Sequence, residues 1–281
     1  MLLLALGLLA AAAPPPASPH PAASHPAASQ AAASQAALVA RGDEAFASRG
    51  DPARLAEAID SYGRAAALHP GDAAAEIRLA RAQAFRALAE PDAAREAWLA
   101  SSRAAERALR TLAPGWAAAV DAGDLAGAPV RVGPDGAAAL YWLALATWSS
   151  AQSKGLAALL AVKDPALAAM ERAAALDGGT DCAGPHRALG AWTAALPSAV
   201  GGGVARSRRH FEEARARGAG CLLNRVREAE SLLVLLQDRA AFEKALAEVE
   251  GATDTDPLWA PENGVARRLA RDLQGRAARL F

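Results

Sequence analysis

Residues 184–214 read GPHRALGAWTAALPSAVGGGVARSRRHFEEA, and this stretch decides the fold. Apolar residues recur at helical spacing on both sides of Pro197 and the glycine run, which indicates a helix–turn–helix unit. Leu189 and Gly190 are the large and small residues of its first helix, and Phe211 and Ala214 are those of the second. The stretch therefore predicts one helical hairpin that places small residues opposite large ones.

Similar hairpins recur along the chain. A first unit ends with Ala58, Tyr62, Ala65 and Pro70, and the segment Arg49–Pro52 separates its two helices. Later units carry apolar stripes that include Ile77, Leu143, Val226 and Leu246, and an amphipathic segment around residues 265–280 is expected to cap the end of the stack. The fold prediction is all-α, a right-handed α-solenoid of tetratricopeptide-like helical hairpins over residues 38–281.

Composition supports this fold class and excludes one class of partner. The chain is rich in alanine, the strongest helix former, and shows no alternating strand pattern. Its 30 basic and 30 acidic residues give no net charge, which argues against a general nucleic-acid binder.

The N-terminus predicts export. Residues 1–13 are almost purely Leu and Ala, too short to span a bilayer of ~30 Å but typical of the apolar core of a signal peptide. The alternative is a misplaced start or a short apolar tail. Residues 14–37, which are rich in Pro, Ala and Ser, are expected to form a disordered linker. No cysteine is available there for lipid attachment, so we expect a periplasmic protein without a transmembrane span.

The segment Ala113–Gly136 is the least repeat-like part of the body, with three prolines and several glycines. It is predicted to be a packed connector, and the alternative is a lid over the concave face.

Cys182 and Cys221 precede the first helices of two neighbouring units. Stacking would bring their loops together, so in an oxidising compartment they are candidates for a disulfide, the alternative being two unrelated buried thiols. No CxxC motif is present.

Catalytic and metal-binding motifs are absent from the sequence. It contains no HExxH, GxSxG or Walker motif and no histidine cluster with metal-ligand spacing. We therefore expect no enzyme activity, no metal site and no cofactor.

Two groups of side chains are candidate ligand contacts. Tyr141, Trp142 and Trp148 could line an apolar groove, although adjacent residues point about 100° apart on a helix, so part of the trio should be core. His186 and Arg187 begin a helix and could receive an anionic group; the alternative is that His186 packs.

A basic cluster includes Arg206, Arg208 and Arg209. It predicts either an edge that steers an acidic partner or an ordinary solvated helix face.

Several short signals occur together in the C-terminal half. They are, in order, ALYWLALA at residues 139–146, Lys154-Gly155, GPHRALG at 184–190, Leu196-Pro197, Gly201–Gly203, ARSRRHFEEA at 205–214, LNRV at 223–226 and an Arg-rich last helix. In this order they resemble the T-component family of TRAP-transporter-associated tetratricopeptide proteins (TatT), over roughly residues 116–279.

The resemblance implies a periplasmic helical protein that forms homotrimers around the solute-binding protein of a TRAP transporter. That partner captures small organic acids or apolar carboxylates, and Lys154 joins the candidate ligand contacts. The sequence thus favours a TRAP partner component that binds a solute-binding protein and a small organic-acid or apolar ligand. The alternative is a generic envelope scaffold for protein–protein interaction.

Overall fold

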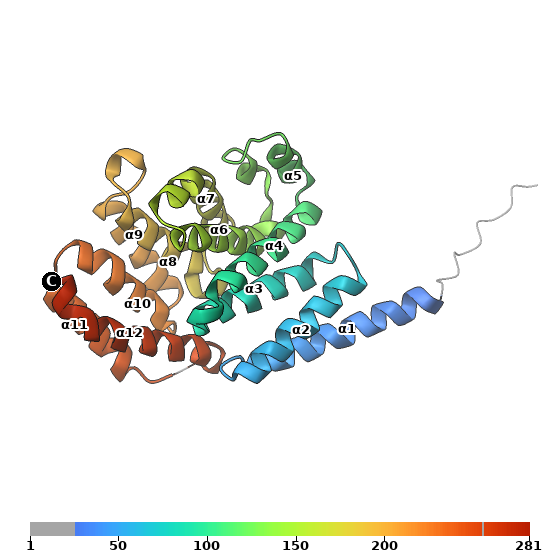
Figure 1. Cartoon of the computed structure of the whole chain (residues 1–281), viewed down its shortest axis with the longest axis horizontal. Helices are drawn as coiled ribbons and strands as arrows, with labels where there is room; N and C mark the ends of the chain where they lie inside the picture. Colours follow the sequence, from blue (N-terminus) through green and yellow to red (C-terminus); the bar gives the residue numbers. More distant parts are fainter. Residues whose placement is uncertain (1–25, 255) are drawn as a thin grey trace, which may run out of the picture.

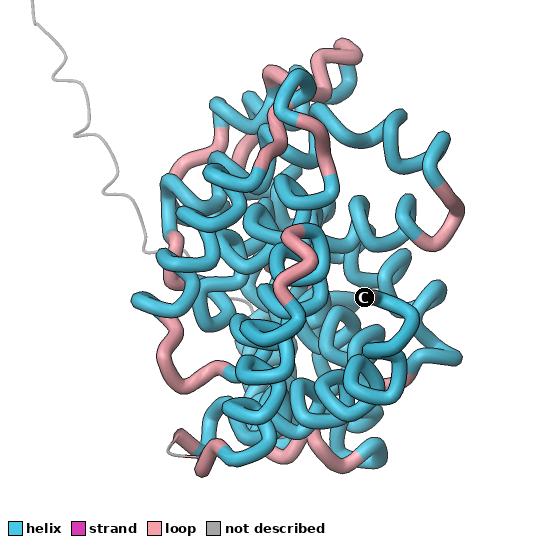
Figure 2. Tube along the Cα trace, turned by 90° about the vertical axis from the view of Figure 1, so that its left-hand side faces the viewer, coloured by secondary structure: helices cyan, strands magenta, loops and turns pink. Residues whose placement is uncertain are grey.

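The computed structural model describes residues 26–254 and 256–281, and this part of the chain contains helices and loops but no strand (Figures 1 and 2). The all-α prediction is confirmed. The α-helices are α1 (Pro26–Ala47), α2 (Pro52–Leu68), α3 (Ala73–Ala89), α4 (Ala94–Leu112), α5 (Pro114–Asp121), α6 (Ala137–Gln152), α7 (Leu156–Asp177), α8 (Thr180–Ala195), α9 (Val204–Arg217), α10 (Leu222–Glu228), α11 (Arg239–Gly251) and α12 (Ala260–Leu280). A π-helical segment, Ala229–Leu233, continues α10.

Local signals set the helix boundaries. The Asp51 side chain accepts a hydrogen bond from the Ala53 amide at 2.8 Å, and Pro52 occupies the first turn of α2. Asp72 caps α3 in the same way, through the Ala74 amide at 2.9 Å. Each such cap is worth about 1 kcal/mol because it satisfies an amide that the helix leaves free.

The helices stack as hairpins. Neighbours along the chain pack together from α1 to α4 and from α6 to α12, and α4 packs on α6. In addition α3 contacts α6, α6 contacts α8, α8 contacts α10, and α10 contacts α12. Contacts between alternate helices are typical of stacked helical repeats, in which one layer of helices lines the inner face.

Small residues allow these helices to approach closely. A Cβ atom added to Gly42 would lie 2.5 Å from the Tyr62 ring, and one added to Gly190 would lie 2.8 Å from the Phe211 ring. The pairing of Gly190 with Phe211 is the small-against-large contact that the opening stretch predicts.

The stack is closed by its last helix. Helix α12 packs on α3, and the Arg268 guanidinium donates to the Leu88 and Ala89 carbonyl oxygens at 3.0 and 3.1 Å. Arg49, after α1, pairs with Glu262 in α12, and Figure 1 shows α12 beside the end of the α1–α2 hairpin. Residues 265–280 thus lie in the last helix of the stack, as predicted, and this helix also contacts the N-terminal helices.

Helix α1 corrects one prediction. It begins at Pro26, inside the 14–37 segment expected to be a disordered linker, so residues 26–37 are helical. Alanine needs no large side chain to favour a helix, because it loses no rotamer entropy there. The predicted signal peptide and residues 14–25 lie outside the described residues.

The 113–136 segment packs against the body. It contains α5 and two short 3₁₀ turns, and it buries Trp116, Ala128 and Val132. Arg172 of α7 donates to the Val132 carbonyl oxygen at 2.7 Å. These contacts are those of a packed connector.

Candidate binding groove

A groove of about 630 Å³ lies on the inner face of the stack. Helices α3, α4, α6, α7, α8 and α10 all contribute to it, together with the π-helical segment. Most of its lining is apolar and includes Leu88, Trp98, Leu145, Leu159 and Val234. A concave site of this size is large enough for a small organic molecule.

Two stacked tryptophans form one wall. The ring centroids of Trp148 on α6 and Trp192 on α8 are 4.2 Å apart, and the ring planes differ by 9°. The two side chains are nearly buried but line the groove. They present a flat apolar surface to anything that enters.

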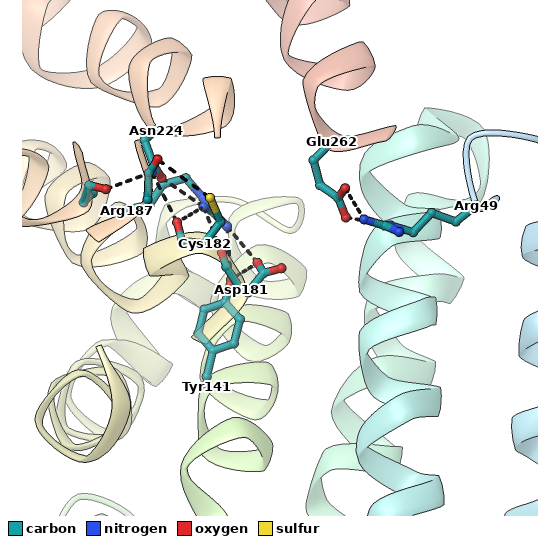
Figure 3. Close-up of polar contacts among 9 residues, drawn as sticks. Arg49, Tyr141, Asp181, Cys182, Arg187, Asn224 and Glu262 are labelled. Carbon is teal, nitrogen blue, oxygen red and sulfur yellow. Dashed lines mark hydrogen bonds and ion pairs between the residues drawn. The ribbon is translucent and has the colours of Figure 1, made fainter. Parts of the chain in front are cut away.

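A buried polar cluster supports the same wall (Figure 3). The Arg187 guanidinium donates to Asp181 Oδ2 at 2.8 Å, to Asn224 Oδ1 at 3.0 Å and to the Tyr141 hydroxyl at 3.3 Å. The Tyr141 hydroxyl donates to Asp181 Oδ2 at 2.7 Å. Arg187 thus joins α8 to both α6 and α10, and its charge is balanced by Asp181.

The pKa shifts in this cluster follow from burial and from the ion pair. Burial and the nearby Asp181 carboxylate raise the pKa of Tyr141 well above its usual value. Burial alone would lower the pKa of Arg187, but Tyr141 and Asp181 outweigh it and the net shift is upward. The hydroxyl stays neutral and the guanidinium stays charged throughout the physiological range.

The chain reaches this cluster through an unusual turn. Asp181, Cys182 and Ala183 have φ angles of 51°, 55° and 60°. These angles lie in the left-handed region, which costs residues other than glycine about 1–2 kcal/mol each. The hydrogen bonds of Arg187 to the Asp181 and Cys182 carbonyl oxygens, both 3.3 Å, help to hold the turn. The right-handed part of α8 starts after it, at Gly184.

The candidate ligand residues separate into two groups. Tyr141, Trp148 and Arg187 line the groove. Trp142 instead lines a second pocket of about 460 Å³ together with Tyr62, as expected for a residue adjacent to Tyr141 on a helix. Lys154 is exposed in the loop after α6 and is not part of the groove lining.

His186 faces another histidine. Its Nδ1 atom lies 3.2 Å from Nδ1 of His210 on α9, and neither residue lines the groove. Burial, followed by the neighbouring His186, lowers the pKa of His210 to about 4. Burial and Arg217 lower the pKa of His186.

The three arginines of the basic cluster differ in their surroundings. Arg206 pairs with Glu171 and donates to the Gly201 carbonyl oxygen at 2.8 Å. Arg208 and Arg209 are exposed, and the described residues offer them no ion-pair partner. Two of the three therefore present free charge to solvent.

Cys182 and Cys221 are free, buried thiols in the same core cluster. The two cysteines therefore lie near each other, as expected, and the disulfide bond itself stays a prediction.

Other lining residues carry no local sequence signal. Trp98 comes from α4, and Arg227, paired with Glu230, comes from the end of α10. The packing of α4 on α6 and of α10 on α8 brings them to the same groove. Within the described residues there is no group of three or more potential metal ligands. Nor does any described helix combine the length and apolarity that crossing a bilayer requires.

Comparison with known families gives one match. A family model described as TRAP transporter T-component (TAtT) matches residues 57–281, which include α3 to α12 and the whole groove. No curated protein matches the chain.

Proposed function

The chain belongs to the TRAP transporter T-component family, and on this premise we propose that it acts in the periplasm as the partner of a TRAP solute-binding protein. In this role it also binds a small organic acid or apolar carboxylate in its groove. The observation that supports the proposal is the inner groove, with its stacked tryptophan wall and a few polar groups among apolar ones.

The groove favours a ligand with a flat or chain-like apolar part. Trp148 and Trp192 offer area for contact, and burial of apolar surface supplies the main driving force. Arg187 already uses its hydrogen bonds inside the protein, so it shapes the wall. Arg227, whose side chain is 28% exposed, pairs with Glu230 through Nη1 and offers its other guanidinium N–H groups to a carboxylate group.

The partner is proposed to dock near the exposed arginines. Arg208 and Arg209 carry charge that no described neighbour neutralises, which suits an acidic surface on the solute-binding protein. A homotrimer of this chain, which the family resemblance implies, would present three such edges.

Titration of the purified chain with the solute-binding protein of its transport system tests the partner. Heat of binding should reveal a complex, and charge reversal at Arg208 and Arg209 together should weaken it about tenfold. Reversal of Arg95 and Arg103, also exposed and without an ion pair, is the matched control. Absence of a complex at high micromolar concentration contradicts the proposed function and favours a general envelope scaffold.

Tryptophan fluorescence tests the ligand. An aromatic carboxylate such as phenylacetate should change the emission of the Trp148–Trp192 pair in a saturable way. The substitution Ala191→Phe places a ring in the groove and should abolish the change. The substitution Ala205→Phe, at an exposed site on α9, should leave the change intact.

A further inference from the structure

Cys182 and Cys221 both contact the Gly218 carbonyl group. Cys182 Sγ donates to the Gly218 carbonyl oxygen at 3.7 Å, and the Cys221 amide donates to the same oxygen at 3.1 Å. The two thiols also lie close enough that each shifts the pKa of the other. Cys182, in the left-handed turn of α8, and Cys221, just before α10, are thus neighbours in one buried cluster although they are 39 positions apart in the sequence.

Hydrogen bonds fix the backbone around both cysteines. The Asn224 amide group donates to the Cys182 carbonyl oxygen at 3.2 Å and to the Gly218 carbonyl oxygen at 3.1 Å. Gly218 approaches this segment closely, because a Cβ atom on it would lie 2.6 Å from the Cys182 carbonyl oxygen. The thiols are therefore held together before any bond forms between them, which raises their effective concentration.

Both cysteines are buried, and one of them lines a surface pocket. Cys221 lines a surface pocket of about 560 Å³ with Arg215, Gly218 and Arg225, whereas Cys182 does not line it. The pKa shifts also favour Cys221, because the neighbouring Cys182 thiol, and then Arg187, lower its pKa. The Cys221 thiol and burial raise the pKa of Cys182.

We propose that Cys182 and Cys221 are a dithiol–disulfide pair, in which Cys221 reacts first with an external disulfide that enters this pocket and Cys182 completes the bond. The Cys221 thiolate attacks one sulfur of the donor, a mixed disulfide forms, and the donor's other sulfur leaves as a thiolate. Cys182 then loses its proton and attacks the Cys221 sulfur, which releases the second donor thiolate. Two protein thiols are oxidised and one donor disulfide is reduced to two thiols.

The bond would clamp the wall of the groove. Cys182 lies in the left-handed turn, and its carbonyl oxygen accepts from Arg187, which also contacts Tyr141. A link from this turn to the start of α10 therefore restrains the polar cluster behind the groove. The inference goes beyond the proposed function and does not depend on it.

Mass spectrometry of the full chain tests the pair. The protein is incubated with oxidised glutathione, quenched with acid, and alkylated under denaturing conditions. We expect the intact mass to fall by two hydrogens, and proteolysis to yield one peptide pair joined through Cys182 and Cys221. Retention of both thiols, or a stable glutathione adduct as the only product, overturns the proposal.

Two variants test the order of reaction. Cys182→Ser should accumulate a glutathione adduct on Cys221, and Cys221→Ser should stay unmodified. The opposite pattern refutes the assigned roles. Because either variant may alter folding, brief alkylation of the reduced wild-type protein gives an independent answer, in which Cys221 should be labelled before Cys182.

Discussion

The buried ion pair between Arg49 and Glu262 should be the most sensitive link in the closed stack. The two side chains face each other from α12 and from the turn after α1 (Figure 3). The Arg49 side chain is 1% exposed and that of Glu262 is 6% exposed. Arg49 Nε donates to Glu262 Oε1 at 2.8 Å, Nη2 donates to the other carboxylate oxygen, and Nη1 donates to the Phe46 carbonyl oxygen at 3.1 Å. Removal of either partner leaves the other buried charge without compensation.

The size of the loss follows from burial. Breaking a buried pair by truncation of one partner costs about 3–5 kcal/mol. For a domain of this size each kcal/mol lowers the melting temperature by about 2–4 °C, so the Glu262→Gln variant should melt roughly 6–20 °C below the wild type. Urea denaturation followed by circular dichroism at 222 nm measures the free energy of unfolding directly.

The two single variants should differ in their dependence on pH. Burial raises the pKa of Glu262, and Arg49 opposes this rise. In Arg49→Met the folded-state pKa of Glu262 therefore lies above its unfolded value, and the variant loses stability as pH rises above the unfolded value of about 4.3 towards neutrality. In Glu262→Gln the unpaired arginine stays charged throughout this range, so its penalty should stay constant.

Controls separate burial from charge. The exposed Arg64–Asp60 pair has the same chemistry, and Arg64→Met should cost no more than about 1 kcal/mol. The double variant Arg49→Met with Glu262→Met should recover much of the loss, since it buries no charge. A Glu262→Gln penalty as small as that of Arg64→Met would refute the view that this pair closes the stack.

Three further outcomes are expected. Because burial lowers the pKa of His210 to about 4, the folded protein binds fewer protons than the unfolded chain. Up to about 3 kcal/mol of stability present above pH 6.5 should therefore be lost as pH falls towards 4, and His210→Gln should flatten this slope in urea titrations. Gly190→Ala should lower the urea midpoint by the equivalent of about 1–3 kcal/mol because its Cβ meets Phe211, whereas Gly63→Ala, with open space around it, should raise it by about 1 kcal/mol. The oxidised thiol pair, which closes a loop of about 40 residues, should stabilise the chain by about 4 kcal/mol over the reduced form, and equal urea midpoints with and without reductant contradict this.

The hairpins could be predicted because their signals are local. Asp51, Pro52 and Asp72 act within one turn of the helices that they start, and the small-to-large pairing of Gly190 with Phe211 lies within a single unit. Such signals depend only on short-range sterics and backbone hydrogen bonding. They define units but give no information on how the first unit meets the last.

Closure of the stack had no such signal. Arg49 precedes Gly50 in what reads as a polar turn, and its partner lies 213 residues away. A sequence of one chain does not show which distant charge a buried arginine meets. The start of α1 was missed for a different reason, because a segment of Ala, Ser, Pro and Gln satisfies the composition of a linker and of a weak helix alike.

The groove could be predicted only in part. Tyr141, Trp148 and Arg187 are on its wall, but Trp142, Lys154 and His186 are not. The aromatic helix indicated a site. The residues of α3, α4 and α10 that also line the groove come together only through the packing of the helices in space. The left-handed turn at Asp181 also has no signal in the sequence, since the nearby glycines would have been the expected positions for positive φ.

Closure has a mechanical consequence for the groove. In an open solenoid each unit contacts only its neighbours, and the superhelix can change curvature at little cost. Here α12 packs on α3, so a change in curvature that moves α12 away from the N-terminal helices also breaks the buried Arg49–Glu262 pair. Helices α3 and α8 both line the groove, and its width is therefore tied to that contact. A ligand should enter through the open side of the groove and leave the backbone nearly unmoved. This behaviour distinguishes the closed stack from repeat proteins that bind their ligands by a change in superhelical curvature.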